Sequence, residues 1–134
     1  MSELQDKLSA AREAKAARDE KRRDAAEARE LEALELETKY ETELGPRGVM
    51  FEIVSNDLGN FVVKRGEFAS HKRFNAKGKD VSEEEVFQLV LPALLHPARD
   101  SATLIFREHA GIAWDCCLAM QTLYRAKRGE DAGK

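Results

Sequence analysis

The sequence predicts a mostly helical α+β protein, in which a long N-terminal helix precedes a small domain with a β-hairpin and three to four short helices. Three observations indicate this fold class. Residues 2–44 contain neither proline nor glycine, Gly45-Pro46-Arg47-Gly48 interrupts that pattern, and a segment rich in β-branched and aromatic residues follows. With 134 residues, the chain has room for one core and an appendage, because a single core usually takes roughly 100 residues.

Residues 1–44 have the composition of a helix that can stand in water. Ala, Glu, Lys, Arg and Leu dominate this segment, and all five are strong helix formers. Acidic residues outnumber basic ones by about four here, whereas the remainder of the chain is close to neutral. The net charge of -3 therefore comes from an acidic N-terminal segment and a nearly neutral remainder.

Apolar residues of this predicted helix gather at its two ends. Leu4 and Leu8 begin one stripe, and Leu36, Tyr40 and Leu44 form another at i, i+4 and i+8. Charged residues fill the middle, where a self-sufficient coiled coil would need Leu or Ile. Two interpretations stay open: a homodimeric coiled coil, or a solvated spacer whose ends contact a partner or the chain's own domain. We expect these five residues to contact a partner.

A linker at residues 45–48 should separate this helix from a domain over residues 49–128. Residues 49–54 and 61–63 predict two strands, and the segment between them, 56–59, has turn residues. Two strands alone are marginally stable in water. We therefore expect the hairpin to lie on helices or to gain another strand.

Helices should complete the domain. A short helix is expected over residues 67–75, and Ser82 with Glu85 has the pattern of a capping box, which marks a helix start. An apolar helix over residues 86–95 should follow, kinked or shortened by Pro92.

Two further helices and a tail should end the chain. Pro97 is expected to open one helix that Gly111 ends, and residues 112–127 should form the last, before a disordered polar tail at 129–134. Apolar positions of the domain should form its core, namely Phe87, Val90, Leu91, Leu94, Leu104, Cys116, Met120 and Leu123.

No residue pattern indicates catalysis, a metal or a cofactor. The three histidines, His71, His96 and His109, form no cluster with cysteines or carboxylates at metal-ligand spacing. Cys116 and Cys117 are adjacent and lack the C-x-x-C spacing, which favours reduced packing residues. The phosphate-binding, dinucleotide-binding and hydrolase motifs are missing too. We predict that the protein is not an enzyme and needs no cofactor.

A basic stretch from Lys64 to Lys79 is the most distinctive binding signal, with Lys64, Arg65, Lys72 and Arg73 as candidate partner-binding residues. Cations interleaved with aromatic rings can contact phosphates and bases. Because the domain is near neutral and the whole chain acidic, we favour a solvated face or a surface for an acidic partner over a nucleic-acid site.

Apolar runs are short throughout the sequence. None approaches the roughly 18 to 20 residues of a membrane span, and the N-terminus is charged from Glu3 onward, unlike an apolar signal region. We expect a cytoplasmic protein.

Four short motifs of the second half resemble a known family. They are Gly59-Asn60-Phe61-Val62-Val63-Lys64-Arg65, His71-Lys72-Arg73-Phe74, Leu94-Leu95-His96-Pro97 and Ala110-Gly111-Ile112. Over roughly residues 58–126 the chain resembles small tail assembly chaperones of bacteriophages. It departs from their pattern at Gly66, His71 and Ala110, where proline, tyrosine and proline are more usual.

The resemblance implies a binding protein without enzymatic activity. Such a protein would coat the long, apolar, helical tape-measure protein before the tail tube forms around it. A homo-oligomeric structural protein of the phage particle is the first alternative. A nucleic-acid-binding adaptor that uses the stretch from Lys64 to Lys79 is the second.

Overall fold

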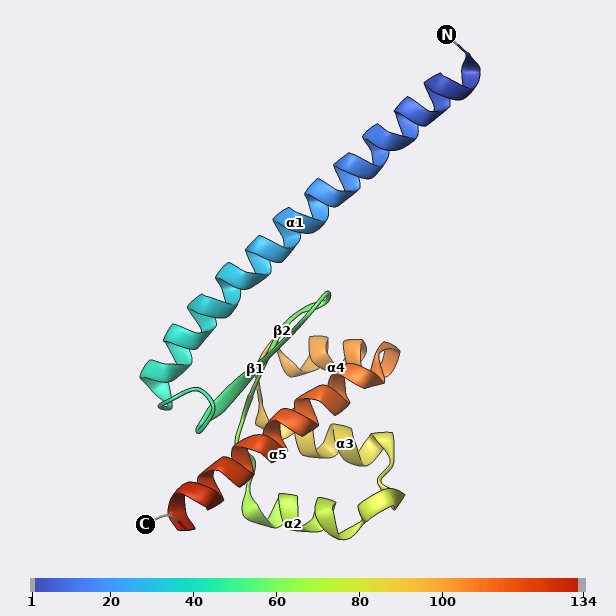
Figure 1. Ribbon diagram of the computed structural model, residues 1–134. Helices are drawn as coiled ribbons and strands as arrows, with labels where there is room; N and C mark the ends of the chain where they lie inside the picture. Colours follow the sequence, from blue (N-terminus) through green and yellow to red (C-terminus); the bar gives the residue numbers. More distant parts are fainter. Residues whose placement is uncertain (1, 133–134) are drawn as a thin grey trace.

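A long helix, a three-stranded antiparallel sheet and a layer of shorter helices are stacked in that order (Figure 1). The computed structural model describes residues 2–132, with the side chains of all of them except Phe68, Lys79 and 126–132. Helix α1 (Glu3–Glu43) lies along one face of the sheet, and the helices after the hairpin lie on the other face. The fold class predicted from the sequence, a mostly helical α+β protein, is confirmed.

Helix α1 begins and ends where its sequence predicts. The Ser2 hydroxyl accepts a hydrogen bond from the Gln5 amide at 3.2 Å, which satisfies one of the free amides of the first turn. Past the last helical residue, Gly45 has a φ of 121°, a left-handed conformation that glycine adopts without steric cost. The continuous helix predicted for residues 3–44 is therefore confirmed to within one residue.

The sheet contains the predicted hairpin and one strand that was not predicted. Strands β1 (Phe51–Asn56) and β2 (Gly59–Lys64) are joined by a two-residue loop, and the Asn56 side chain accepts a hydrogen bond from the Leu58 amide at 2.9 Å. Strand β3 (Leu94–His96) then pairs with β2 and completes the order β1-β2-β3.

Strand β3 comes from a segment that the sequence predicted to be helical. The capping box is confirmed, since the Ser82 hydroxyl accepts from the Glu85 amide at 3.3 Å, and helix α3 (Glu83–Val90) starts there. Pro92 lacks an amide hydrogen and stops the helix. A 3-10 turn at Leu91–Ala93 follows, and the chain enters β3. The shortening expected at Pro92 is confirmed, but residues 94–95 form a strand where a helix was predicted.

Three other helices complete the domain. Helix α2 (Phe68–Ala76) matches the short helix predicted over residues 67–75. Helix α4 (Arg99–Glu108) ends at His109, and α5 (Ala110–Ala132) starts one residue later.

The boundaries of α4 and α5 differ from those predicted. Pro97 lies two residues before α4 instead of opening it, and Gly111 lies in the first turn of α5, so it does not end α4. The backbone at residues 129–132 continues α5 where a disordered tail was predicted, and residues 133–134 lie outside the described part.

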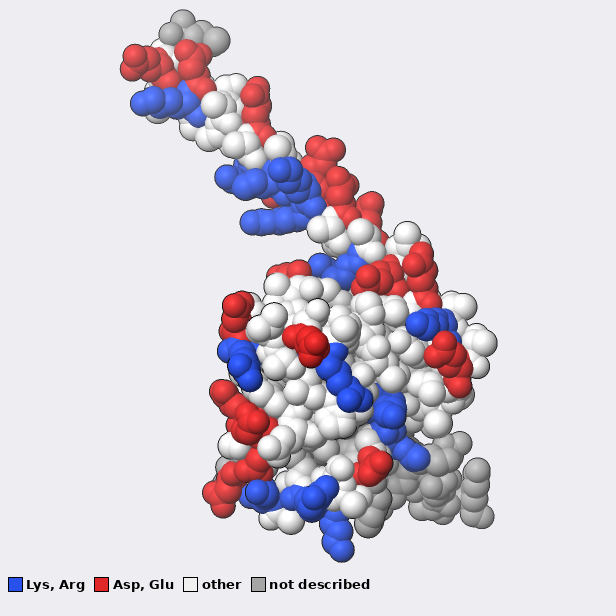
Figure 2. All heavy atoms as spheres, turned by 180° about the vertical axis from the view of Figure 1, so that it is seen from behind, with Lys and Arg blue, Asp and Glu red and all other residues white. Residues whose placement is uncertain are grey.

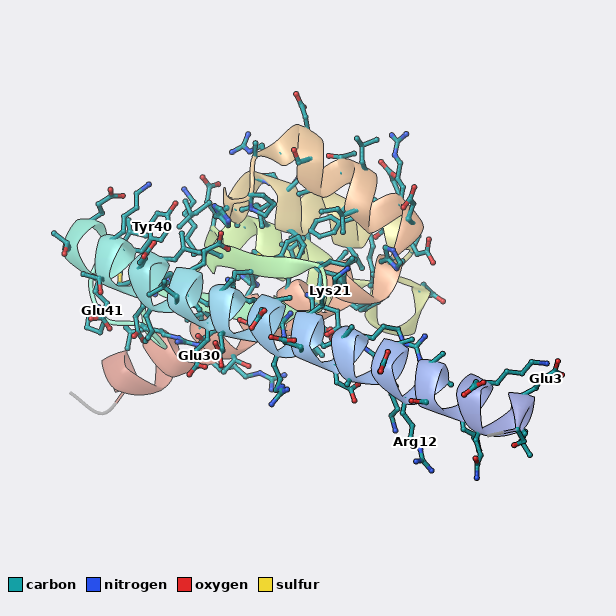
Figure 3. All side chains as sticks on the ribbon, turned by 90° about the horizontal axis from the view of Figure 1, so that it is seen from above. Glu3, Arg12, Lys21, Glu30, Tyr40 and Glu41 are labelled. Atoms are coloured by element: carbon teal, nitrogen blue, oxygen red, sulfur yellow. The ribbon has the colours of Figure 1, made fainter. Side chains whose placement is uncertain are left out.

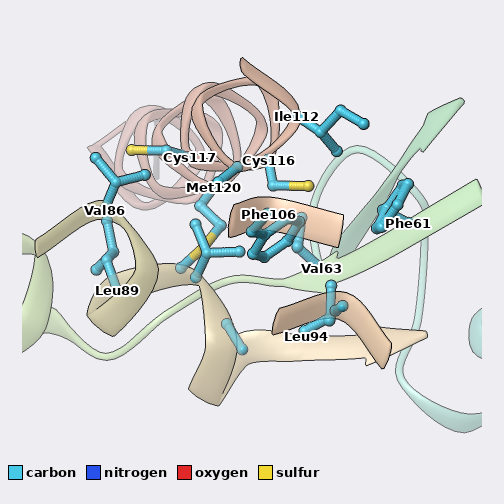
Figure 4. Packing of buried hydrophobic residues seen from close by; sticks show 14 residues of the cluster. Phe61, Val63, Val86, Leu89, Leu94, Phe106, Ile112, Cys116, Cys117 and Met120 are labelled. Carbon is cyan, nitrogen blue, oxygen red and sulfur yellow. The ribbon is translucent and has the colours of Figure 1, made fainter. Parts of the chain in front are cut away.

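The main core lies between the sheet and helices α3, α4 and α5 (Figure 4). Phe61 and Val63 of β2 meet Phe106 of α4, and the Phe61 and Phe106 ring centroids are 5.9 Å apart. Most predicted core residues are buried as expected, namely Val90, Leu94, Cys116, Met120 and Leu123.

Three predicted core residues are less buried than expected. Phe87 and Leu91 are only partly buried. Leu104 is 67% exposed, so its prediction is wrong. It follows Ala102 by two residues and precedes Phe106 by two, which places it on the opposite side of α4 from both buried residues.

A second apolar cluster fixes α1 to the outer face of the sheet. Leu36 and Tyr40 of α1 pack on Phe51, Ile53 and Val62. The Tyr40 and Phe51 rings lie 5.9 Å apart, and the Tyr40 hydroxyl donates a hydrogen bond to the Leu95 carbonyl at 3.2 Å.

Polar contacts extend this attachment toward the middle of α1. The Asn60 amide donates hydrogen bonds to the Arg29 carbonyl and to the Glu32 carboxylate, both at 2.9 Å. Beyond the C-terminal end of the helix, Arg47 forms ion pairs with Glu37 and Glu52. Helix α1 is thus held to the domain from Arg29 onward.

Truncation of Leu94 and of Leu104, which lie on either side of Pro97, should have very different effects on stability. We expect Leu94→Ala to lower the free energy of unfolding by about 2–5 kcal/mol, because it leaves a cavity in the core. Leu104→Ala should change it by less than about 0.5 kcal/mol, because its side chain is exposed. Chemical denaturation of both variants measures the difference. Equal losses would contradict the burial of Leu94 and the exposure of Leu104.

Candidate protein-binding surfaces

A groove lies between α2 and α3 in the described part of the chain. It consists of two cavities of about 550 and 240 Å³ that share Ser70, Gln88 and Leu89 as lining residues. The larger cavity falls in the range of roughly 300 to 1,000 Å³ that is typical of binding sites. We call the two together the α2–α3 groove.

The α2–α3 groove combines an apolar floor with a basic rim. Leu89 is buried in its floor, and Phe74, Pro92 and Ala93 add apolar surface. Its charged lining residues are the cations Lys64, Arg65, Arg73 and Lys77 and the carboxylates Glu67 and Glu85.

The chain path explains why these charges converge. Strand β2 ends at Lys64, and the chain turns directly into α2, so Lys64 and Arg65 stand at one end of the groove. Arg73 lies in the last turn of α2, at the other end.

Only part of this charge is neutralised within the protein. The Lys77 ammonium lies 3.0 Å from the Glu85 carboxylate, and its hydrogen bond holds the pKa of Glu85 below the usual value. Lys64, Arg65 and Arg73 make no ion pair with any residue that the structure describes. Against these three cations stands one unpaired carboxylate, that of Glu67, so the groove favours an acidic ligand.

His71 lies buried beside the segment that leads from β2 into α2. Its ring stacks on Tyr124 at 4.7 Å between centroids, and neither ring nitrogen has a hydrogen-bond partner among the described residues. A β-carbon at Gly66 would lie 2.9 Å from the His71 Nε2 atom. Two of the positions that depart from the tail assembly chaperone pattern, Gly66 and His71, are therefore in contact, and His71 acts as a packing residue.

The cysteines are also packing residues. Cys116 and Cys117 are buried in the main core. Burial raises the pKa of Cys116 to about 12 and that of Cys117 to about 11. Thiols of such high pKa are poor nucleophiles at neutral pH. Within residues that the structure describes, no three His, Cys, Asp or Glu side chains are grouped so as to hold a metal ion.

The structure places three of the four basic residues predicted to bind a partner in the α2–α3 groove and one outside it. Lys64, Arg65 and Arg73 line the α2–α3 groove, whereas Lys72 is exposed on α2 and does not line it. This difference follows from the helical geometry, because adjacent residues point about 100° apart.

The predicted apolar contacts of α1 divide into two groups. Leu36 and Tyr40 are buried against the chain's own sheet, and Leu44 packs beside them. The expectation that these three contact a partner is therefore corrected: they hold α1 to its own domain, because the outer face of the hairpin is itself apolar. Leu4 and Leu8 are 66% and 47% exposed.

The N-terminal part of α1 extends away from the domain. Almost every side chain from Glu3 to Ala28 is exposed, and these residues span roughly 40 Å at 1.5 Å per residue. Glu3 lies clear of the domain in Figure 3, whereas Tyr40 lies over it. Between Glu3 and Ala28, no side chain forms a hydrogen bond or ion pair with the described part of the domain.

Opposite sides of this projecting helix carry opposite charges. Leu4, Arg22 and Tyr40 follow one another at intervals of about five turns, so they lie on the side of α1 that faces the sheet. We call this side the inner face of α1; its projecting part consists of Leu4, Leu8, Ala11, Lys15, Arg18 and Arg22. Along the middle of the projecting helix, Figure 2 shows Lys and Arg gathered on one edge and Asp and Glu on the other.

The outer face of α1 contains two leucines that sequence reasoning missed. It consists of Glu27, Leu31, Leu34, Thr38 and Glu41, which follow one another at steps of four and three residues. Leu31 and Leu34 are 58% and 56% exposed. Leu31 and Leu34 precede Leu36 by five and two residues, which are not the spacings of three or four that place residues on one helix face. This spacing could have shown from the sequence that they belong to a different face.

Comparison of the chain with protein-family models, curated proteins and solved structures finds no match. Among the described helices, none is both long and apolar enough to cross a membrane.

The buried thiols should resist alkylation in the folded protein. With pKa values of about 12 and 11, Cys116 and Cys117 have almost no thiolate near neutral pH. We expect iodoacetamide to leave both unmodified in native buffer and to modify both in denaturant, as measured by intact mass. Rapid labelling of the native protein would contradict their burial.

Acidification should destabilise the protein through His71. Burial, and then the nearby positive charge of Arg65, lower the pKa of His71 from its ordinary value. Below about pH 6.5 the unfolded chain therefore binds more protons at this position than the folded chain, and the free energy of unfolding falls as the pH decreases.

His71→Phe keeps an aromatic ring against Tyr124 and should lose less stability than the wild type between about pH 7 and pH 5. Denaturation midpoints at the two pH values measure this. The exposed His109 offers a control, since His109→Phe should keep the wild-type dependence. An unchanged dependence in His71→Phe would exclude His71 as its source.

Proposed function

We propose that this protein is a non-enzymatic, tail assembly chaperone-like protein that binds a helical, tape-measure-like client in the α2–α3 groove. The observation that carries the proposal is the groove itself, with its apolar floor and three cations without ion-pair partners in the described part of the chain. The four motifs that resemble phage tail assembly chaperones support it, and two of them contribute residues to the groove rim.

An amphipathic helix fits the chemistry of this groove. Its apolar residues at i, i+3, i+4 and i+7 would pack on Leu89, Pro92 and Ala93, as in other complexes of a helix with an apolar groove. Carboxylates on its flanks would meet Lys64, Arg65 and Arg73. Such charge pairs at the rim contribute more to specificity and association rate than to affinity. We therefore expect a client whose apolar face is bordered by Asp and Glu.

A protein client suits the groove better than nucleic acid does. Two of its six charged lining residues, Glu67 and Glu85, are carboxylates that would repel phosphates. Lys77 is already paired with Glu85. Nucleic-acid binding of useful affinity normally depends on many unopposed phosphate contacts.

The client can be identified by capture from the native host. The tagged full-length chain should recover a long helical tail protein, identified by mass spectrometry, and co-expression should raise the soluble yield of that protein. Arg65→Glu combined with Arg73→Glu should weaken binding by about tenfold or more, since it reverses the charge at both ends of the groove. Lys72→Glu is the matched control, because Lys72 lies on the same helix outside the groove.

A designed peptide tests the recognition chemistry separately. A labelled amphipathic helix with glutamates beside its apolar face should bind more tightly than the same helix with lysines there, and Arg65→Glu with Arg73→Glu should reverse the preference. Equal binding of both peptides, or loss of binding only in Lys72→Glu, would rule out the groove as the client site.

A further inference from the structure

We propose that α1 links copies of this chain head to tail. The inner face of the projecting part of α1 in one copy, the donor, packs in parallel on the outer face of α1 in a second copy, the acceptor. This contact is separate from the α2–α3 groove, which lies among helices on the other side of the sheet from α1.

The exposed leucines of α1 form two pairs on opposite faces of the helix. Leu4 and Leu8 belong to the inner face, and Leu31 and Leu34 to the outer face. All four are about half exposed or more. Because the pairs lie on opposite sides, one helix cannot bury both against a single partner surface, but two copies can bury one pair of each against the other.

Charges around the two leucine pairs are complementary. Basic residues lie on or beside the donor face, namely Lys7, Arg12, Lys15 and Arg18, and acidic ones lie on or beside the acceptor face, namely Glu27, Glu30, Glu35 and Glu41. None of these eight residues forms an ion pair elsewhere in the described part of the chain. Opposite charges on the two faces favour contact between different faces over contact of like faces.

One register satisfies both the apolar and the charged residues. When Leu8 lies opposite Leu31, a shift of 23 residues, Ala11 lies opposite Leu34 and Arg18 opposite Glu41. Donor positions 4, 8, 11, 15 and 18 then have the same steps of four and three as acceptor positions 27, 31, 34, 38 and 41. Matching steps allow side chains of parallel helices to meet in layers, as in a coiled coil. In a parallel pair the residues that flank the seam meet across it five positions apart, so the same shift brings Lys7 near Glu35 and Arg12 near Glu30.

The domain excludes the antiparallel alternative. An antiparallel pair with Leu8 opposite Leu31 would place the first two turns of the acceptor helix, residues 3–10, along residues 29–36 of the donor, on its inner face. That face is already covered by the donor's own sheet through Leu36 and Asn60. In the parallel arrangement, the donor's sheet contact begins at Arg29, eleven residues after the last paired position, Arg18. The acceptor helix has ended by that point.

The parallel contact is heterologous, because each copy uses one face as donor and the other as acceptor. A contact of this kind does not close on itself in a dimer, so it propagates into a chain or a ring. Each copy in such an assembly keeps its α2–α3 groove free.

Sedimentation velocity of the purified full-length protein tests the proposal without any client. The wild type should form species that grow with protein concentration and shrink as salt increases, because charge pairs contribute. Leu4→Glu with Leu8→Glu removes the donor face, and Leu31→Lys with Leu34→Lys removes the acceptor face. Self-association of each double variant should weaken by about tenfold or more. Its circular dichroism and melting temperature should stay unchanged, because all four side chains are exposed.

Mixing the two double variants is the decisive measurement. The donor-deficient variant keeps an intact acceptor face, and the acceptor-deficient variant keeps an intact donor face, so an equimolar mixture should form one-to-one dimers and nothing larger. The groove variant, Arg65→Glu with Arg73→Glu, should self-associate like the wild type, which separates this proposal from the proposed function. A wild type that stays monomeric, or a mixture that does not form dimers, would overturn it.

Discussion

The packing of the last third of α1 on the outer face of the hairpin is the contact on which the rest of the structure depends. A three-stranded sheet has two apolar faces here, and helices α3, α4 and α5 cover only one of them. Leu36 and Tyr40 cover the other, and the Tyr40 hydroxyl donates a hydrogen bond to the Leu95 carbonyl in β3. Without this layer, Phe51, Ile53 and Val62 would be exposed to water, at a cost that so small a core could hardly offset.

This attachment also divides α1 into two parts that expose different faces to solvent. From Arg29 onward one side of the helix is occupied by the sheet, so only its outer face, with Leu31 and Leu34, can meet another molecule. Before Arg29 the whole circumference is open, and the basic inner face is accessible. A single straight helix thus presents a basic inner face in its projecting part and an acidic outer face, from Glu27 to Glu41, nearer the domain. The proposed head-to-tail contact follows from that asymmetry.

The α2–α3 groove depends on two interruptions of regular structure. Strand β2 ends at Lys64, and the chain turns into α2 at Gly66, where His71 leaves no room for a side chain. Helix α3 ends before Pro92, and the turn that follows supplies Pro92 and Ala93 to the groove. These two interruptions fix where the backbone carries the cations, so that mainly their side chains have to be ordered when a ligand binds.

Local signals in the sequence determined the long helix, its end at Gly45, the hairpin and the capping box at Ser82, because each depends on residues only a few positions apart. They also marked Lys64, Arg65 and Arg73 as candidate binding residues, although not the groove that all three line. Tertiary structure alone decided that Leu94 starts a strand, since an apolar segment of that length suits a helix or a strand equally well until β2 offers its free edge. It likewise decided that Leu36 and Tyr40 pack inward while Leu31 and Leu34 stay exposed. Composition gives the same apolar character to all four, and only the position of the sheet distinguishes them.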